Sequence, residues 1–489
     1  MAAPPRLRRV SPHHSLSGRI LLEQHPPEPT LRRALGLWAA IAIVIGTAIG
    51  SGIFIVPAKM IRSVGSPGLV FGVWIFGGVL TLFGALTYAE LSAALPDAGG
   101  EYVYLNAAYG PFWGFIYGWT QTWVAKSASI ATLATGFANY LAFFFPKLAK
   151  PLFVVPLHIG PEGGLLEIQY GQLLGIGLIL FLAAVNYLGV QVGGDVQVVV
   201  TAVKLALIGA LIVAGLTWGH GSYSHFSESI PANPGGVSGF FAALVAALWA
   251  YDGWNNAGML GSEIQNPQKN LPRALLVGTT LMIAIYLLTN LAYFYVLRGA
   301  EVGATPRVAA EAMQRVLGNS GASVVSVAAM ISIFAALNGS ILSGSRVPYA
   351  MARDGMFFHR MSRINPVFRT PGACIVLLGV VSSIILLSGR YDELATLVIF
   401  PSWILYGMTA ASVIVLRKKR PDMYRPYRVP GYPIVPIFFV FVAIALLYST
   451  LLNSPRESGI GLVLIIAGLP FYFHWKRRLD ADPTRFPGS

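Results

Sequence analysis

Long apolar runs separated by short polar connections dominate the chain from about residue 35 to residue 475. A bilayer core about 30 Å thick needs roughly 20 consecutive apolar residues of α-helix, and most of the runs reach about that length. The pattern predicts membrane-spanning helices rather than the short alternating strands of a membrane β-barrel. We expect twelve spans, at about 35–61, 68–95, 112–146, 171–192, 196–217, 239–262, 274–297, 321–349, 372–389, 394–416, 432–452 and 459–475.

The composition agrees with an all-α membrane protein. Of the 489 residues, 55% are apolar and only 11% are charged, against about 25% charged residues in soluble domains. These values exclude an ordinary soluble enzyme, a disordered protein and a collagen-like fibre. The sequence contains no nucleophile–base motif and no metal-ligand motif, so we expect that the protein is not an enzyme and uses no metal or other cofactor.

The formal net charge of +14 has a specific distribution along the chain. About two thirds of the 34 lysines and arginines lie in alternate connections: the N-terminal tail, the region near Lys269, 346–369, 417–428 and 476–489. Because positively charged loops stay in the cytoplasm, we expect both termini to be cytoplasmic. The basic residues then face the anionic head groups of the lipid bilayer, and we expect no nucleic-acid binding.

Two of the predicted spans contain interruptions rich in glycine and polar residues. The first span contains residues 46–52 (GTAIGSG), and the sixth contains residues 249–258 (WAYDGWNNAG). Gly46 and Gly50 also form a GxxxG pair of the kind that lets helices pack closely. Interruptions in the leading helices of two sets of five spans indicate an inverted-repeat transporter with its site at the membrane midplane.

A broken helix exposes backbone groups that can bind a small zwitterion. The second half-helix begins with N–H donors around Gly50, Ser51 and Gly52, which suit a carboxylate. The first half-helices end with carbonyls that suit an ammonium group. A site with both kinds of group predicts a free α-amino acid as the substrate. The carbonyls expected to bind the amine are those of Ile45, Gly46, Trp249, Ala250 and Tyr251.

Seven motifs resemble the amino acid–polyamine–organocation (APC) superfamily, and within it the L-type amino acid transporter group. The resemblance extends from about residue 34 to about residue 475. It implies a LeuT-like fold, in which two inverted repeats of five helices, with broken first and sixth helices, precede two additional helices. The motifs are 46–54 (GTAIGSGIF), 88–91 (YAEL), 99–102 (GGEY), 126–129 (KSAS), 249–255 (WAYDGWN), 263–272 (EIQNPQKNLP) and 349–355 (YAMARDG).

The predicted organisation follows from this fold. Cytoplasmic tails at 1–34 and 476–489 flank the membrane domain. The expected parts of that domain are a first five-helix repeat at 35–217, a second inverted repeat at 239–416, and two additional helices at 432–475.

Lys204 falls near the middle of the fifth span, too deep for its ammonium to reach either membrane surface easily. The ammonium can instead donate to carbonyls of the broken first span. In sodium-coupled relatives of this fold, a sodium ion takes those carbonyls together with hydroxyl groups of the eighth span. The resemblance places Lys204 where it would replace that ion, with Ser340 and Ser343 as neighbours, and it implies sodium-independent transport.

The second interruption supplies the predicted gate and side-chain pocket, formed by Trp249, Asp252, Asn255 and Asn256. Family members usually have Phe at the gate position, where this chain has Trp249. An ionised Asp252 would attract a cationic side chain. The resemblance, however, places aspartate here both in carriers of cationic substrates and in exchangers of small neutral amino acids, of which we favour the second.

Two further charged residues are candidates for gating. Lys126 in the third span matches a family lysine, and Glu90 lies near the cytoplasmic end of the second span. The alternatives are a lysine near a helix end that reaches the membrane surface, and an acid that serves only in packing.

The prediction for function is a sodium-independent exchanger or facilitator of small neutral L-amino acids, working by alternating access as a multi-pass protein of the cell inner membrane. A cationic amino-acid or polyamine carrier and a proton-coupled symporter remain alternatives. Animal members carry an external cysteine that joins a partner subunit, but residues 147–170 contain none and Cys374 is the single cysteine. We therefore expect free amino acids and the lipid bilayer as partners, and no disulfide-linked subunit.

Overall fold

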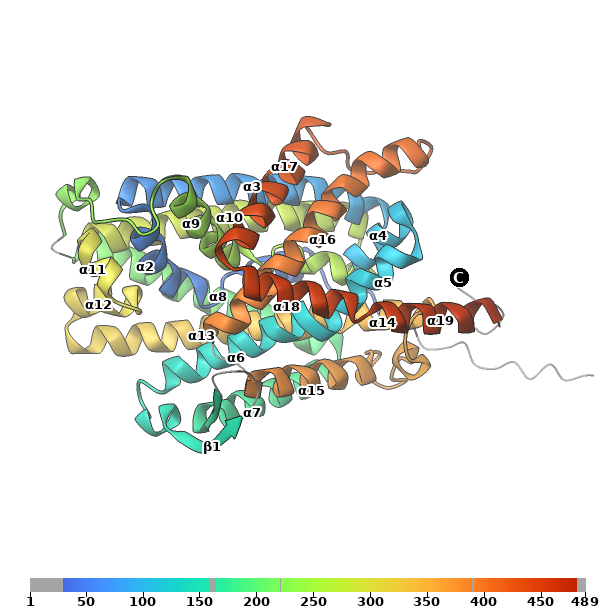
Figure 1. The fold of residues 1–489 in the computed structure, drawn as a ribbon, viewed down its shortest axis with the longest axis horizontal. Helices are drawn as coiled ribbons and strands as arrows, with labels where there is room; N and C mark the ends of the chain where they lie inside the picture. Colours follow the sequence, from blue (N-terminus) through green and yellow to red (C-terminus); the bar gives the residue numbers. More distant parts are fainter. Residues whose placement is uncertain (1–29, 158–163, 220, 389–390, 482–489) are drawn as a thin grey trace, which may run out of the picture.

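Long helices that run side by side form the body of the protein (Figure 1). The computed structural model describes residues 30–157, 164–219, 221–388 and 391–481, so the predicted tail segments 1–29 and 482–489 lie outside the described residues. Within the described part, eight helices are long and apolar enough to cross a membrane, or nine if one bent pair is a single span. Six are α3 (Pro67–Ala94), α7 (Tyr170–Tyr187), α8 (Val190–Thr217), α10 (Pro267–Val296), α16 (Tyr391–Lys419) and α17 (Ile434–Asn453). The other two combine α13 (Asn319–Gly344) with α14 (Arg346–Arg353) and α18 (Pro455–Ile466) with α19 (Leu469–Ala481).

Both glycine-rich interruptions are breaks in a helix. The first separates α1 (Leu37–Ala48) from α2 (Gly52–Val64), and the two axes meet at 42°. The second ends α9 (Gly236–Tyr251) before a non-helical stretch and the short 3₁₀-helix η4 (Asn256–Met259). Helix α9 is shorter than a full span, as is α15 (Gly372–Ser388).

The third predicted span also departs from a regular α-helix. It consists of α5 (Pro111–Thr120), a π-helical turn η1 (Gln121–Ala125) and α6 (Lys126–Leu141), which follow one another without a gap. Single π-turns inside α-helices occur often at functional sites because they redirect the side chains that follow. The side chain directly after this turn belongs to Lys126.

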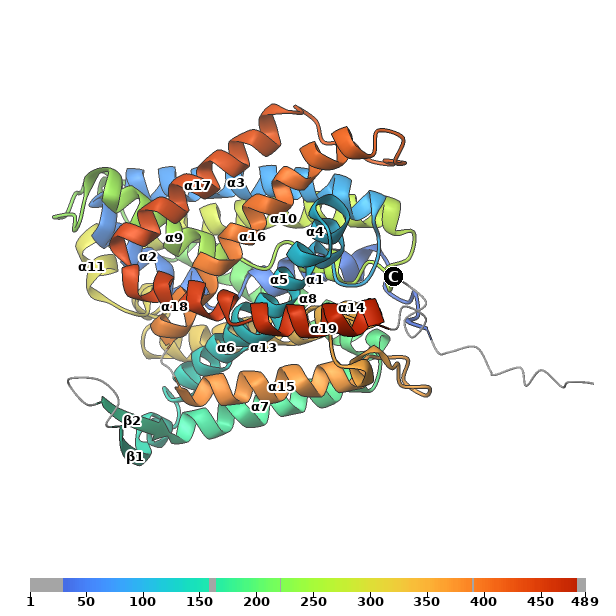
Figure 2. The same ribbon diagram turned by 45° about the vertical axis from the view of Figure 1, so that its right-hand side comes forward.

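The purely α-helical prediction omits one small element. Strands β1 (Pro151–Leu157) and β2 (Gly164–Gln169) form an antiparallel pair, with Val154 opposite Glu167. The strands project from one end of the helical body (Figure 2). Their apolar runs, of seven and six residues, are too short to stand out among the spans. The remaining short elements are α4 (Glu101–Tyr109), α11 (Gly299–Ala304), α12 (Val308–Leu317), η2 (Pro146–Ala149), η3 (Tyr223–Ser227) and η5 (His359–Ser362).

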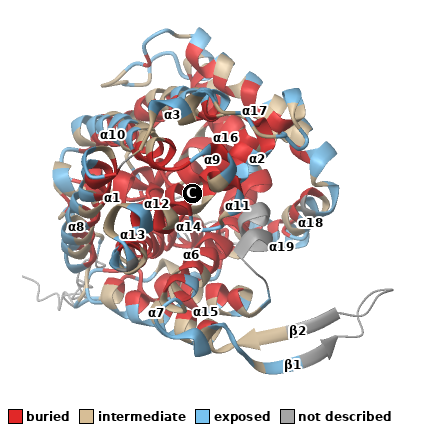
Figure 3. Ribbon diagram, turned by 90° about the vertical axis from the view of Figure 1, so that its left-hand side faces the viewer, coloured by how far each residue is buried: buried red, intermediate tan, exposed pale blue. Residues whose placement is uncertain are grey.

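Buried residues concentrate along the middle of the helical body, and exposed residues lie around its perimeter (Figure 3). Many exposed side chains are nevertheless large and apolar, including Phe181 on α7, Val199 on α8 and Phe441 on α17. A soluble protein seldom exposes apolar surface on this scale. The outward faces therefore fit contact with lipid, and the structure is that of a multi-pass helical membrane protein.

A buried ion pair closes the end of the helical body that carries α14. Arg346 donates through Nε and Nη2 to the two carboxylate oxygens of Glu263, at 2.7 Å each, and neither side chain is exposed. The backbone N–H of Leu35, just before α1, donates to the carbonyl of Glu263 at 3.0 Å. The ion pair and this backbone bond therefore join the start of α14, the segment after η4 and the start of α1.

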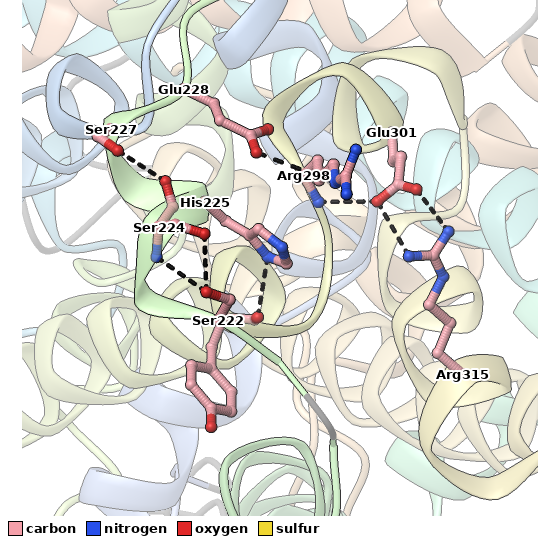
Figure 4. A network of polar contacts seen from close by, with 9 residues as sticks. Ser222, Ser224, His225, Ser227, Glu228, Arg298, Glu301 and Arg315 are labelled. Atoms are coloured by element: carbon pink, nitrogen blue, oxygen red, sulfur yellow. Dashed lines mark hydrogen bonds and ion pairs between the residues drawn. The ribbon is translucent and has the colours of Figure 1, made fainter.

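The opposite end has an exposed network of polar contacts (Figure 4). Arg315 on α12 makes two hydrogen bonds to Glu301 on α11, at 2.5 and 3.1 Å, and Arg298 lies 3.9 Å from Glu228. Arg62 on α2 donates to the carbonyl of Gly303 at 2.7 Å. These contacts hold the α11–α12 pair against the second half of the broken first helix.

The two ion pairs should differ greatly in their effect on stability. Glu263→Gln leaves the Arg346 guanidinium buried without a counter-charge, which costs about 3–5 kcal/mol. Glu301→Gln is the matched control, because its pair is solvent-exposed and such pairs contribute about 1 kcal/mol or less. Denaturation of the purified variants in detergent should show a large loss for Glu263→Gln alone, and equal losses would contradict this account.

Candidate functional site

The broken first helix depends on Lys204 of α8. The Lys204 ammonium is fully buried and donates to the carbonyls of Gly46 at 2.8 Å and Ile49 at 2.6 Å. Ser332 of α13 donates to the carbonyls of Ile49 at 2.9 Å and Gly50 at 3.2 Å. A break in a helix leaves backbone carbonyls without their helical N–H donors, and the membrane core contains no water to replace them. The Lys204 amine and the Ser332 hydroxyl therefore supply the missing hydrogen bonds.

A second set of contacts joins the two breaks to each other. The hydroxyl of Tyr286 on α10 donates to the carbonyl of Ala48 at 3.2 Å and to that of Ala250 at 2.5 Å. The hydroxyl of Thr47 donates to the carbonyl of Gly253 at 2.8 Å. Gly253 has a φ of +98°, a conformation that glycine adopts without strain. The breaks therefore form one hydrogen-bonded unit.

A cavity of about 20 Å³ lies between the two breaks, enough space for about one water molecule. Its walls come from both broken segments and from α6 and α13. The lining residues are Thr47, Ala48, Gly50, Ser51, Gly52, Ser129, Leu133, Trp249, Asp252, Gly253, Asn256 and Ser340.

Charged and amide groups of the second break are held from neighbouring helices. Tyr406 of α16 donates to Asp252 Oδ1 at 2.8 Å, and Lys126 Nζ donates to Asn256 Oδ1 at 2.8 Å. The Asp252 carboxylate also lies within electrostatic range of the Lys126 ammonium. The cavity wall formed by this break thus includes an acid whose charge has a nearby counter-charge.

Asn255 turns away from the cavity toward a buried carboxylate. Its side-chain amide donates to Glu101 on α4, which also accepts from the hydroxyl of Tyr117 at 2.9 Å. Glu101 is fully buried. Asn255 therefore anchors the non-helical stretch to α4 and does not line the cavity.

The structure brings seven of the predicted site residues to the cavity: Gly50, Ser51, Gly52, Trp249, Asp252, Asn256 and Ser340. Of the five carbonyl residues predicted for the amine, Trp249 alone lines this cavity. The carbonyls of Gly46 and Ala250 instead accept from Lys204 and Tyr286. The carbonyl of Ile45 accepts the backbone N–H of Ile49 at 2.9 Å, and the Tyr251 hydroxyl donates to the Trp74 carbonyl at 3.1 Å.

Two predicted neighbours of Lys204, Ser340 and Ser343, lie elsewhere than expected. Ser343 donates to the Gly339 carbonyl of its own helix at 2.8 Å. The hydroxyl that shares the Ile49 carbonyl with the Lys204 amine belongs instead to Ser332, about three turns earlier on α13. Ser340 lines the cavity. Glu90 pairs with Arg417 at 2.6 Å and accepts the backbone N–H of Val429 at 2.8 Å, away from the residues that line the cavity.

The sequence analysis did not single out Thr47, Ala48, Ser129, Leu133 and Gly253 as site residues. Four of these five lie inside motifs that the resemblance identifies, so the motif boundaries were a usable signal. Ser332, Tyr286, Tyr406 and Tyr117 lie outside those motifs, and no local pattern indicates their contacts with the breaks.

Gly52 has a packing role that affects how it can be tested. A Cβ at this position would lie 2.7 Å from Ala250 Cβ and 2.8 Å from Ala250 Cα. Substitution would therefore push α2 away from α9 whether or not a substrate is present. At Gly50 the tightest contact would be 3.1 Å, to the flexible end of Leu133, which can adjust.

A small cavity between two broken helices, in a body of lipid-facing helices, is typical of membrane transporters. A family model of amino acid permeases matches residues 35–469. The serine/threonine exchanger SteT of Bacillus subtilis is 35% identical over 457 residues, which cover 93% of this chain and 99% of that protein. Human b(0,+)-type amino acid transporter 1 is 32% identical, with coverage of 94% and 91%, and the human cystine/glutamate transporter is 30% identical, with coverage of 94% and 89%.

The chain belongs to the amino acid permease family and is a membrane transporter of amino acids. The family assignment based on the seven motifs is thereby confirmed, and so is the prediction of amino-acid transport.

Lys204 should matter more for the stability of the breaks than its neighbours do. Lys204→Met removes both hydrogen bonds from the ammonium, and we expect a loss of about 2 kcal/mol or more. Ser332→Ala should cost about 1 kcal/mol, since Ile49 keeps its bond from Lys204. The exposed Lys269→Met is the control and should change stability little.

Thermal denaturation of the three purified variants in detergent measures this order. Stability equal to wild type in Lys204→Met would show that the ammonium does not hold the break.

Proposed function

We propose that the protein is a sodium-independent exchanger of small neutral L-amino acids that works by alternating access. The observation that carries this proposal is the cavity between the breaks, whose walls include the start of α2 and the ends of α1 and α9. A helix N-terminus and helix C-termini on one cavity offer opposite partial charges to one ligand. A zwitterionic α-amino acid is complementary to both.

In this proposal the substrate carboxylate binds at the N-terminus of α2. The Gly50 N–H donates to the Ala48 carbonyl at 2.8 Å and so forms the turn at the break. The carboxylate then takes the N–H groups at positions 51 and 52 and the Ser51 hydroxyl. The dipole of the 13-residue helix α2 adds to this attraction.

The substrate ammonium binds on the other side of the cavity. We assign it to the carbonyl of Thr47, at the end of α1, together with that of Trp249, because both residues line the cavity. The Ala48 carbonyl already accepts from the Gly50 N–H and the Tyr286 hydroxyl. A carbonyl that already accepts one hydrogen bond has a second lone pair for another. This assignment replaces Ile45, Gly46, Ala250 and Tyr251, and keeps Trp249 as the aromatic gate.

Charge balance supports a neutral side chain. The carboxylate of Asp252 would favour a cationic substrate if it stood alone, but Lys126 lies within electrostatic range of it. The Lys126 charge offsets that of Asp252. Glu101, the other carboxylate within range of Lys126, accepts from Asn255 and Tyr117 and does not line the cavity. The likeness to a serine/threonine exchanger favours a small substrate.

Sodium independence rests on Lys204. Its ammonium donates hydrogen bonds to the carbonyls of Gly46 and Ile49. The Ile49 carbonyl also accepts a hydrogen bond from the Ser332 hydroxyl. Backbone carbonyls and a hydroxyl are the ligands that a sodium ion would need in this position. The Lys204 amine held there donates to these carbonyls in place of a bound ion.

We further propose the twelve-span, LeuT-like topology. The first five spans are α1–α2, α3, α5–η1–α6, α7 and α8, within residues 35–217, and the inverted second set is α9–η4, α10, α13, α15 and α16, within 239–416. The two additional spans are α17 and α18–α19, near 432–475. The distribution of Lys and Arg supports cytoplasmic termini and a cell inner-membrane location. Cys374, the single cysteine, is buried, which supports transport without a disulfide-linked subunit.

Alternating access then requires both ends of the site to open in turn. The contacts that tie α1 to the segment after η4, through Leu35, Glu263 and Arg346, must separate for release to the cytoplasm. On the other side, Trp249 covers the cavity and moves with the substrate. Glu90 is assigned to the scaffold, and Lys126 to the cavity wall through Asn256.

Counterflow in proteoliposomes tests this function together with its charge balance. Vesicles preloaded with unlabelled serine should take up labelled serine faster than empty vesicles, and preloaded arginine should not stimulate uptake. Lys126→Met leaves Asp252 without its counter-charge, so external arginine should inhibit serine uptake more strongly than in wild type. Asp252→Asn should keep serine affinity within about tenfold, or 1.4 kcal/mol.

The double variant Lys126→Met with Asp252→Asn is the control and should return arginine inhibition to the wild-type level. Strong stimulation by arginine in the wild type, abolished by Asp252→Asn, would contradict the neutral-substrate proposal and favour a cationic carrier.

A further inference from the structure

Helices α7 and α15 lie side by side at one edge of the helical body (Figures 1 and 2), and a second hollow lies between them. Its volume is about 370 Å³, within the range of small-molecule sites. None of its lining residues lines the cavity between the breaks. The groove is apolar, with walls from Leu180, Ala183, Ala184, Leu188, Val376 and Gly379, and with Tyr187 at one end.

Small residues create this groove. A Cβ added at Gly379 would lie 3.5 Å from Ala183 Cβ, so the two helices are close at this level. Larger side chains then stand on either side of the contact, where Leu180 is 49% exposed and Val376 is 54% exposed. Because α7 faces outward among lipid-facing helices, the material that fills the groove in a membrane is apolar and elongated.

One end of the groove meets a basic loop. Tyr187 accepts a hydrogen bond from Asn365 Nδ2 at 3.1 Å through its hydroxyl and from Thr370 Oγ1 at 2.9 Å through its carbonyl. The Phe368 ring packs on the Tyr187 ring with centroids 5.9 Å apart. Arg369, between Phe368 and Thr370, is therefore fixed beside the groove, and it is exposed.

The backbone at Arg369 is unusual for its residue type. Its φ is +56°, one of two positive values recorded for non-glycine residues in the described part of the chain. A residue without a local reason to adopt this conformation costs about 1–3 kcal/mol, and such strain collects at binding sites. The exposed Arg363 adds further positive charge to the same loop.

We infer that the groove between α7 and α15 binds an anionic phospholipid of the cytoplasmic leaflet, with an acyl chain along the groove and the phosphate at Arg369. An apolar channel that ends in arginine matches the two halves of such a molecule. Basic sites between membrane helices on the cytoplasmic side are places where anionic head groups bind. This inference does not depend on which amino acid is transported, and it rests on the proposed cytoplasmic side of the 354–371 loop.

Native mass spectrometry of the purified full chain tests the inference with two probes, phosphatidylglycerol and phosphatidylcholine with identical acyl chains. We expect phosphatidylglycerol to bind more tightly. Arg369→Asn removes the charge with a residue that tolerates positive φ, and it should weaken phosphatidylglycerol binding about fivefold, the effect of one arginine at an anionic surface. Ala184→Phe fills the groove from an exposed position and should reduce the binding of phosphatidylglycerol without unfolding the protein.

Arg428→Asn is the matched control. Arg428 is also an exposed arginine, but it lies in the connection from α16 to α17, at the opposite edge of the helical body from α7 and α15 (Figure 2). Its substitution should leave phosphatidylglycerol binding unchanged. Equal affinity for the two lipids, unchanged binding in Ala184→Phe, or a dimer in which a second copy covers the groove would each overturn the inference. Serine counterflow by the same variants shows separately whether the transporter itself is intact.

Discussion

Backbone carbonyls freed by a helix break inside a membrane must find donors, because the hydrocarbon core supplies none. The first helix stops at Ala48 and a new one starts at Gly52, and the carbonyls between and before them are met by Lys204, Ser332 and Tyr286. The Lys204 amine has more than one N–H and can donate fully to two of these carbonyls at once, whereas a hydroxyl has a single proton to share between two. The interrupted helix, and with it the cavity, exists because α8, α13 and α10 carry these three side chains.

The same contacts make the two breaks depend on each other. Tyr286 binds carbonyls from both, and Thr47 of the first bonds directly to Gly253 of the second. A movement of α1 therefore disturbs the wall that α9 gives to the cavity. At one end, the buried Arg346–Glu263 pair adds a further tie between the start of α1 and the segment after η4. In the proposed mechanism, amino-acid exchange is consequently a movement of both broken helices against the helices that hold them.

The sequence predicted the breaks well, because glycines and polar residues clustered within an apolar run are costly in a regular membrane helix. It also predicted that Lys204 is buried near the carbonyls of α1, since a lysine in mid-membrane needs acceptors. It could not predict the partners that come from distant parts of the chain. Ser332 rather than Ser343 meets the break because the rotation of α13 decides which hydroxyl faces α1, and the Glu101–Asn255 and Arg346–Glu263 contacts depend on packing between remote helices. The β-hairpin was missed because its strands, of seven and six residues, are far shorter than the spans that dominate the hydropathy pattern.

The central claim is that the ammonium of Lys204 stands where a transported cation would otherwise bind. The most direct test is the initial rate of labelled serine exchange by wild-type protein in proteoliposomes, with sodium chloride on both sides replaced by choline chloride or potassium chloride. The account predicts the same rate in all three salts. A rate that falls to background without sodium and recovers in proportion to added sodium would contradict it.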